Sequence, residues 1–236
     1  MKLRWLVGWH IVHPLARLFV GFRTEGRSHL ARLPNFILSS NHISNLDPII
    51  LGLAAKRELH FLAKAELFRH NKFFAWLIRT YNAFPLARDV VDFTAIRQVR
   101  SLLRKNRPVT VFPEGSRSRS GDFQPFKPGI GLLAINARVP AVPAYIYGLK
   151  DSFLSYTVDR DIRRPDPAER RAGSWRAFLA GRRRIGVRFG PPIHPDGFQA
   201  NRHEYERYTE AINRSIRELE NDCPQGAQNN QTTKEV

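Results

Sequence analysis

The order of apolar and polar positions along the chain predicts alternating strands and helices. Short apolar runs, several of them rich in β-branched residues, are typical of buried strands, whereas apolar residues that recur every three or four positions are typical of amphipathic helices. The short runs predict strands at 36–40, 59–63, 83–87, 109–113, 141–148 and 185–190. The remaining segments predict helices at 48–56, 64–80, 93–106, 128–138 and 202–220. This alternation predicts an α/β fold, a single domain with a mostly parallel or mixed sheet flanked by helices.

The first apolar segment, residues 5–22, stands apart from this alternation. It holds one charged residue, Arg17, and is long enough to cross a membrane. Two histidines, a proline and two glycines argue against a span, and Trp5 and Trp9 suit the headgroup zone of a bilayer. We expect a membrane-interfacial or half-inserted helix. A true span and a helix packed on the domain itself stay open as alternatives.

These patterns predict three parts of the chain. Residues 1–23 form the membrane-associating helix, 24–221 the folded domain, and 222–236 a polar, disordered tail. Because the strand and helix pattern begins near Phe36, we expect removal of residues 1–22 to affect membrane binding more than the domain.

The net charge of the chain indicates what kind of partner it binds. The 236 residues include 38 basic and 21 acidic side chains, a net charge of +17. Such a balance indicates an anionic partner, which is nucleic acid, a membrane surface or a phosphorylated substrate. The excess is spread over the first 200 residues, without the block of like charge that marks a nucleic-acid-binding arm. Its densest stretch, within 157–184, is either a solvated surface or an anionic contact.

Thiol and metal chemistry are not indicated. A single cysteine, Cys223, excludes an internal disulfide framework and a Cys-rich zinc site, and we take this residue to be incidental. The histidines show no metal-ligand spacing, so we expect no metal.

The first candidate for chemistry is a strand end followed by a turn and a helix start. His42 lies there, and Asp47 follows five residues later. Such a turn can fold the carboxylate onto the imidazole, which makes the minimal general base. The alternative is that Asp47 is only a helix N-cap, with Pro48 at the first helical position, and that His42 is a polar turn residue.

The second candidate follows the predicted strand at 109–113. Ligands usually bind at such strand ends in α/β sheets. A glycine permits close backbone approach, and hydroxyl and guanidinium groups beside it suit phosphate. The residues concerned are Glu114, Gly115, Ser116, Arg117 and, further on, Lys127. A structural ion pair of Glu114 and plain solvation of the arginines are the alternatives.

Together these segments resemble the glycerolipid acyltransferase family, in particular the 1-acylglycerol-3-phosphate (lysophosphatidic acid) acyltransferases. The resemblance covers roughly residues 24–195. It consists of four blocks in order: N-H-x-x-x-x-D at 41–47, an aromatic-to-arginine block at 84–88, F-P-E-G-T/S-R-S at 112–118, and V-P-x-x-I at 142–146. Three departures are Ser116 in place of the commoner threonine, Asn82-Ala83 where a glycine is frequent, and a long, Arg-rich stretch at 157–184.

The resemblance implies an enzyme of phospholipid biosynthesis. A fatty acyl group would pass from acyl-CoA or acyl carrier protein to the free hydroxyl of lysophosphatidic acid, with no cofactor, no metal and no covalent acyl-enzyme. His42 would be the general base and Asp47 its partner. The acceptor, chiefly its phosphate, would be held by Arg88, Glu114, Gly115, Ser116, Arg117 and Lys127.

The same resemblance implies the binding partners and the cellular location of the protein. We expect anionic membrane lipids, the acyl donor and a lysophospholipid acceptor as partners, no nucleic acid, and a peripheral or half-inserted position at the cytoplasmic face of a membrane. The same chemistry on another lysophospholipid, a lyso-amino-acid lipid or glycerol 3-phosphate is the alternative. A non-catalytic basic protein that binds membrane or nucleic acid is a more remote one.

Overall fold

A computed structural model describes residues 3–70, 72–86, 92–118, 122–149, 152 and 185–223. A continuous N-terminal helix has three parts: α1 (Leu3–Val7), the π-helical η1 (Gly8–Val12) and α2 (His13–Val20). The other helices are α3 (Ser28–Ala31), α4 (Asp47–Ala55), α5 (Leu67–His70), α6 (Lys72–Thr80), α7 (Phe93–Arg104), α8 (Gly129–Ala137) and α12 (Arg202–Asn221). The strands are β1 (Arg23–Glu25), β2 (Ile37–Ser40), β3 (His60–Lys64), β4 (Ala83–Leu86), β5 (Val109–Val111), β6 (Ala141–Tyr147) and β7 (Gly186–Phe189).

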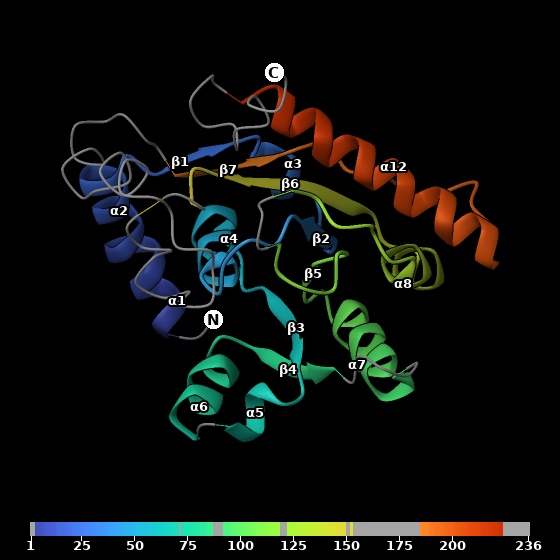
Figure 1. Cartoon of the computed structure of the whole chain (residues 1–236), viewed down its shortest axis with the longest axis horizontal. Coiled ribbons are helices and arrows are strands. Elements are labelled where there is room, and N and C mark those ends of the chain that lie inside the picture. Colours follow the sequence, from blue (N-terminus) through green and yellow to red (C-terminus); the bar gives the residue numbers. More distant parts are fainter. Residues whose placement is uncertain are drawn as a thin grey trace, which may run out of the picture.

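The seven strands form one sheet in the order β1-β7-β6-β2-β5-β3-β4 (Figure 1). Every neighbouring pair is parallel except β6 and β7, which are antiparallel. The predicted α/β domain with a mixed sheet and flanking helices is therefore confirmed.

Two hydrophobic clusters occupy the two faces of this sheet, and β6 contributes to both. Val142, Ala144 and Ile146 face the cluster that contains α4 and the N-terminal helix. Tyr145 and Tyr147 face the cluster formed with α7, α8 and α12. The amphipathic helix predicted over 202–220 is confirmed, because Tyr208, Ile212 and Ile216 on one side of α12 are fully buried there.

Two of the differences from the sequence prediction concern strands. The helix predicted over 64–80 begins too early, because β3 continues its ladder with β4 to Lys64, and the Ala65 amide still donates to the Leu86 carbonyl at 3.2 Å. The short strand β1 was not predicted, since its sequence, Arg-Thr-Glu, has no apolar alternation. It pairs with β7 at the sheet edge.

The N-terminal helix packs on α4 through its tryptophans. Trp5 and Trp9 are buried, and the Trp9 indole N–H donates to the Gly52 carbonyl at 3.0 Å. Gly52 leaves the space for Trp5, since a Cβ there would lie 2.4 Å from the Trp5 ring. The prediction that these two tryptophans lie in a headgroup zone is therefore wrong.

The opposite face of the same helix is apolar and exposed; Leu18 and Phe19 are 75% and 58% exposed. Further exposed apolar side chains on it are Leu3, Val7, Ile11, Val12 and Leu15. No helix within the described ranges combines the length and apolar character needed to cross a bilayer.

The folded part of the chain reaches at least Cys223. This side chain is buried in the second cluster, and burial raises the pKa of its thiol to about 11. The predicted tail therefore begins later than residue 222, and residues 224–236 lie outside the described ranges.

Candidate active site

Three neighbouring parallel strands bring the candidate residues to one edge of the sheet. The strands β2, β5 and β3 are adjacent, so their carboxyl ends lie at the same edge. Strand β2 leads into His42, β5 leads into residues 112–118, and β3 ends at Lys64. This edge is where ligands bind in α/β folds.

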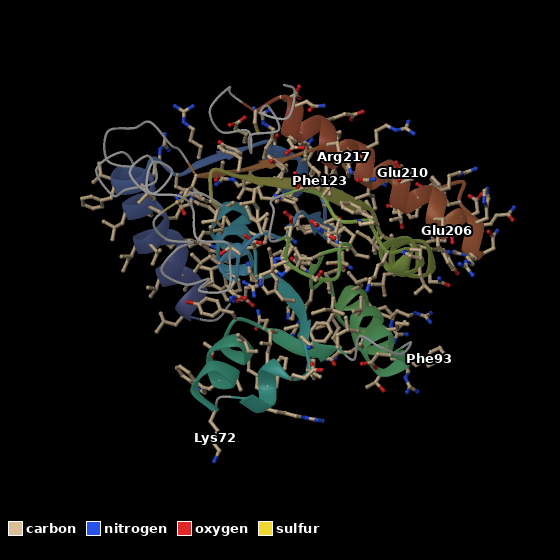
Figure 2. The ribbon with its side chains drawn as sticks, viewed as in Figure 1. Lys72, Phe93, Phe123, Glu206, Glu210 and Arg217 are labelled. Atoms are coloured by element: carbon tan, nitrogen blue, oxygen red, sulfur yellow. The ribbon has the colours of Figure 1, made fainter. Side chains whose placement is uncertain are left out.

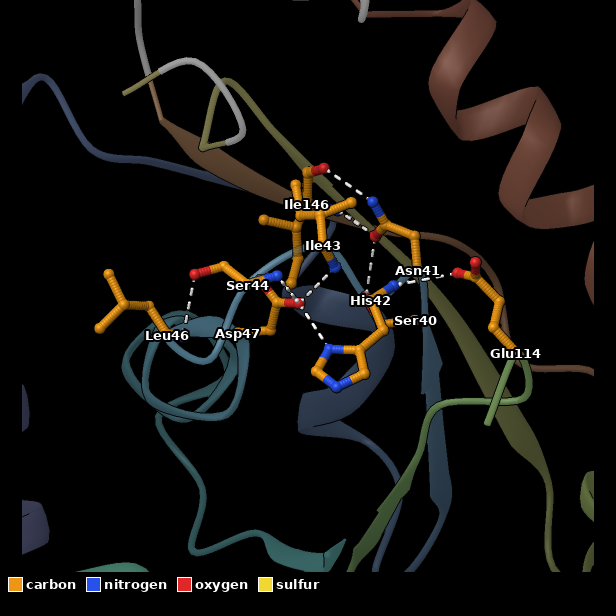
Figure 3. A network of polar contacts seen from close by, with 9 residues as sticks. All are labelled: Ser40, Asn41, His42, Ile43, Ser44, Leu46, Asp47, Glu114 and Ile146. Carbon is orange, nitrogen blue, oxygen red and sulfur yellow. Dashed lines mark hydrogen bonds and ion pairs between the residues drawn. The ribbon is translucent and has the colours of Figure 1, made fainter. Parts of the chain in front are cut away.

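Asp47 holds both the His42 ring and the turn that carries it (Figure 3). Its Oδ2 lies 2.8 Å from His42 Nδ1 and accepts the backbone N–H groups of Ile43 and Ser44 at 2.7 and 2.9 Å. The simple N-cap interpretation is therefore wrong. Asp47 is the first residue of α4, the preceding Leu46 makes no side-chain cap, and the Asp47 carboxylate points back to the turn.

The His42 ring is fixed in orientation and in tautomer. An ionised carboxylate only accepts hydrogen bonds, so Nδ1 carries the ring proton and Nε2 keeps its lone pair. The ring stacks on Phe112 with centroids 4.0 Å apart and planes at 17°. Asp47 is fully buried and the His42 side chain is 15% exposed, so the imidazole is reachable while its carboxylate partner is not.

The backbone of His42 is held on both sides by the segment after β5. Its N–H donates to Glu114 Oε1 at 3.0 Å, and its carbonyl accepts the Ser118 N–H at 2.7 Å. Glu114 Oε2 accepts the Gln124 N–H at 3.0 Å. Burial raises the pKa of Glu114, and the two backbone donors partly oppose that rise. Glu114 thus uses both carboxylate oxygens on the protein's own backbone.

Asn41 ties the end of β2 to β6. Its amide nitrogen donates to the Ile146 carbonyl at 3.0 Å, and its oxygen accepts the Ile146 N–H at 2.8 Å (Figure 3). This side chain therefore continues the pairing of the two strands beyond their ladder and sets the level at which His42 leaves the sheet.

A cavity of about 730 Å³ opens beside His42. Gly115, Lys64 and Lys127 contribute polar or cationic groups to its lining. Gly115 has φ +72°, a conformation that favours glycine, and a Cβ there would lie 3.2 Å from both Cε and Nζ of Lys127. The rest of the lining is mainly apolar and includes Phe61, Leu62, Ile96, Val99, Val111 and Ile130.

The structure thus brings together His42, Asp47, Glu114, Gly115 and Lys127. Ser116 is exposed and Arg117 half-buried directly after Gly115, and in the described part of the chain neither belongs to the cavity lining. Arg88 and the stretch 157–184 fall outside the described residues.

Sequence reasoning missed two contributions to the site. Lys64 lines the cavity, although the sequence placed it at the start of a helix. A cation directly after an apolar strand was the signal for it. Phe112 was identified only as part of the F-P-E-G block, because sequence spacing cannot show that its ring stacks on His42.

Comparisons with known proteins find relatives of this chain. Residues 21–147 match the family described as Acyltransferase. The 1-acyl-sn-glycerol-3-phosphate acyltransferase of Bacillus subtilis (strain 168) is 26% identical over 208 residues, which cover 87% of this chain and 91% of that protein. The enzyme of the same name from Streptococcus pneumoniae is 35% identical over 136 residues, 56% of this chain and 50% of that protein.

A solved structure has a similar fold. The crystal structure of the 1-acyl-sn-glycerophosphate (LPA) acyltransferase PlsC from Thermotoga maritima matches with a TM-score of 0.60 and 24% identity, over 95% of this chain and 86% of that chain. Since the family match spans more than half of the sequence, the chain belongs to the Acyltransferase family.

Proposed function

We propose that this protein transfers a fatty acyl chain from an acyl thioester to the free hydroxyl of lysophosphatidic acid, with His42 as general base. The observation that carries the proposal is the buried Asp47–His42 pair, 2.8 Å apart, on an apolar cavity whose lining also holds cations. The names of the relatives support the same acceptor.

The proposed reaction needs only groups of this chain and the two substrates. His42 Nε2 takes the proton of the acceptor hydroxyl while its oxygen attacks the thioester carbonyl carbon. Asp47 stabilises the imidazolium that forms. The tetrahedral intermediate collapses, the C–S bond breaks, and the leaving sulfur receives the proton from His42. The products are an ester and a free thiol, and the base is regenerated.

The two kinds of group in the cavity lining, cationic and apolar, suit the two parts of a lysophospholipid. Lys64 and Lys127 can hold the phosphate as cations, and we assign Arg88 and Arg117 to the same task on the strength of the family blocks. The apolar lining suits an acyl chain. We propose that Glu114, whose oxygens are used on backbone amides, positions His42 and does not touch the acceptor.

The N-terminal helix suits a substrate that resides in a bilayer. We propose that its exposed apolar face lies in the interface, at the cytoplasmic face where acyl thioesters are available, while its tryptophans hold it on the domain. The net charge of +17 favours anionic headgroups.

The test is an acceptor panel with one acyl-CoA and one acyl carrier protein donor and identification of the lipid product. We expect acyl transfer to lysophosphatidic acid, and we expect His42→Ala to lower kcat by about 10³-fold or more without a change in circular dichroism. His194→Ala, an exposed histidine elsewhere, is the matched control. Full activity of His42→Ala would overturn the mechanism, and preference for glycerol 3-phosphate or another lysolipid would overturn the acceptor.

A further inference from the structure

The charged side chains of α7 and of the turn after it are all cations. Arg97, Arg100 and Arg104 follow one another at i, i+3 and i+7, which places them on one face of the helix. Lys105 and Arg107 continue the series past the helix end, and all five side chains are exposed. We call these five residues the α7 basic stripe.

No acidic side chain neutralises this stripe within the described part of the structure. None of its five cations forms an ion pair there, and the one carboxylate at this helix, Asp92, accepts the Thr94 and Ala95 amides as N-cap. The surface of α12 is different, because Arg202 pairs with Glu206 and Arg207 with Glu204. A solvated helix usually mixes both signs in this way, so the stripe presents an uncancelled positive field.

The helix that carries the stripe is also a wall of the active-site cavity. Ala95, Ile96 and Val99 on its inner side line the same cavity as His42. In Figure 1, α7 and the N-terminal helix lie on opposite sides of the molecule. A partner bound to the stripe would therefore stand next to the reaction site and away from the face that we assign to the membrane.

The side chains and the shape of the stripe favour a protein over a membrane or a small anionic ligand. A helix that lies on a membrane combines cations with exposed apolar side chains. In α7 the apolar Ala95, Val99 and Leu103 are buried, and the large apolar side chain that is exposed is Phe93 at its first turn (Figure 2). Nucleotides and other small ligands bind in concave sites, whereas the stripe lies on a convex helix face. Arginine is enriched where proteins meet proteins.

We propose that the α7 basic stripe docks an acidic acyl carrier protein, which delivers the acyl thioester into the cavity behind it. This inference rests on the proposed function and names the donor for it. Charge attraction between two such surfaces raises the association rate, and added salt screens it. Docking at the stripe therefore predicts that kcat/KM for the carrier-protein donor falls as the ionic strength rises.

The test compares two charge-reversal variants of the full chain with two donors, palmitoyl acyl carrier protein and palmitoyl-CoA, and lysophosphatidic acid as acceptor. Arg97→Glu/Arg100→Glu alters the stripe. Arg32→Glu/Arg214→Glu makes the same change of charge at exposed arginines of other elements. At about 10 mM salt we expect the stripe variant alone to lose about tenfold or more in kcat/KM for the carrier protein, with kcat/KM for palmitoyl-CoA unchanged.

A second measurement separates docking from catalysis. Fluorescence anisotropy with labelled apo carrier protein, which holds no acyl chain, should show binding to the wild type and to the control variant but not to the stripe variant. An equal loss with both donors, an unchanged carrier-protein rate, or loss of anionic-vesicle binding in place of carrier binding would each overturn the inference. If the wild type transfers from palmitoyl-CoA but not from the carrier protein, the docking inference is overturned and the proposed function stands. If the wild type transfers from neither donor, the proposed function itself is contradicted.

Discussion

At the scale of single residues, one oxygen atom organises the candidate base. Asp47 Oδ2 receives three N–H groups, from His42 Nδ1 and from two amides of the turn. The sequence spacing of five predicted that a His–Asp pair could form, but the same aspartate before a proline also predicts an N-cap. Only the direction of the carboxylate decides between them, and that direction depends on backbone angles in the turn which spacing does not encode.

Asp47→Asn should remove catalysis while the turn keeps its shape. The amide oxygen of asparagine can take the position of Oδ2 and accept the same three N–H groups, but it carries no negative charge. Without that charge beside the imidazolium, kcat should fall by about 10³- to 10⁴-fold with little change in KM. Steady-state kinetics checks this, with the exposed Asp222→Asn as control; near-normal kcat in Asp47→Asn would show that the charge of this carboxylate is not needed.

Glu114→Gln tests whether this residue acts through His42. Glutamine offers one acceptor oxygen where Glu114 uses two, so either the His42 or the Gln124 amide loses its partner. We expect kcat to fall by about 10²-fold through misplacement of the base, with KM for both substrates unchanged. Glu218→Gln on the exposed side of α12 is the control. A rise in KM for the acceptor alone would instead place Glu114 on the substrate, as the family resemblance implies.

The same residue gives a prediction for pH. Burial raises the pKa of Glu114, so the folded state holds this proton more tightly than the unfolded chain. Its contribution to stability is therefore complete below the ordinary value of 4.5 and is lost as the pH rises through the raised pKa. Urea unfolding should show the free energy of unfolding of the wild type falling relative to that of Glu114→Gln as the pH rises above 4.5. A constant difference would contradict the burial effect.

At the scale of elements, the apolar strands were predictable and the polar edge strand β1 was not. Val109–Val111 and Ala141–Tyr147 are short, apolar and β-branched or aromatic, and they occupy the centre of the sheet. Edge strand β1 is polar and forms because β7 offers it a partner 163 residues later, which no local pattern records. The break at 64–66 likewise depends on the ladder with β4, a long-range contact.

Gly52→Ala tests how far the N-terminal helix is part of the domain. Since the new Cβ would meet the Trp5 ring at 2.4 Å, this helix must shift away from α4, and we expect a loss of about 1–3 kcal/mol in the free energy of unfolding. Gly129→Ala, whose Cβ meets nothing within 4 Å, is the matched control. Equal stability of the two variants in urea would show that the helix is separable, as the sequence pattern suggested.

At the scale of the whole molecule, two surfaces of different chemistry lie far apart: the apolar face of the N-terminal helix and the α7 basic stripe (Figure 1). The sequence showed the excess of positive charge but not this division, because it depends on which side of each helix the core covers. One end of the molecule is suited to a lipid surface and the other to a charged partner in water.

Leu18→Glu/Phe19→Glu tests the apolar face. Both side chains are largely exposed, so the double change should leave folding intact while it removes co-sedimentation with anionic vesicles. Arg214→Glu alters the net charge by the same amount on α12 and should still sediment. If the double variant also sediments fully, another surface holds the protein on the membrane.

The hydrogen bonds between His42 and the segment after β5 have a consequence for folding. Glu114 lies 72 residues from His42, so neither loop has its active shape until β2 and β5 lie side by side. The candidate active site therefore forms only when the sheet assembles and is not a preformed local turn. Loss of activity in denaturant should coincide with loss of the sheet itself, and no fragment that ends before β5 should retain residual turnover.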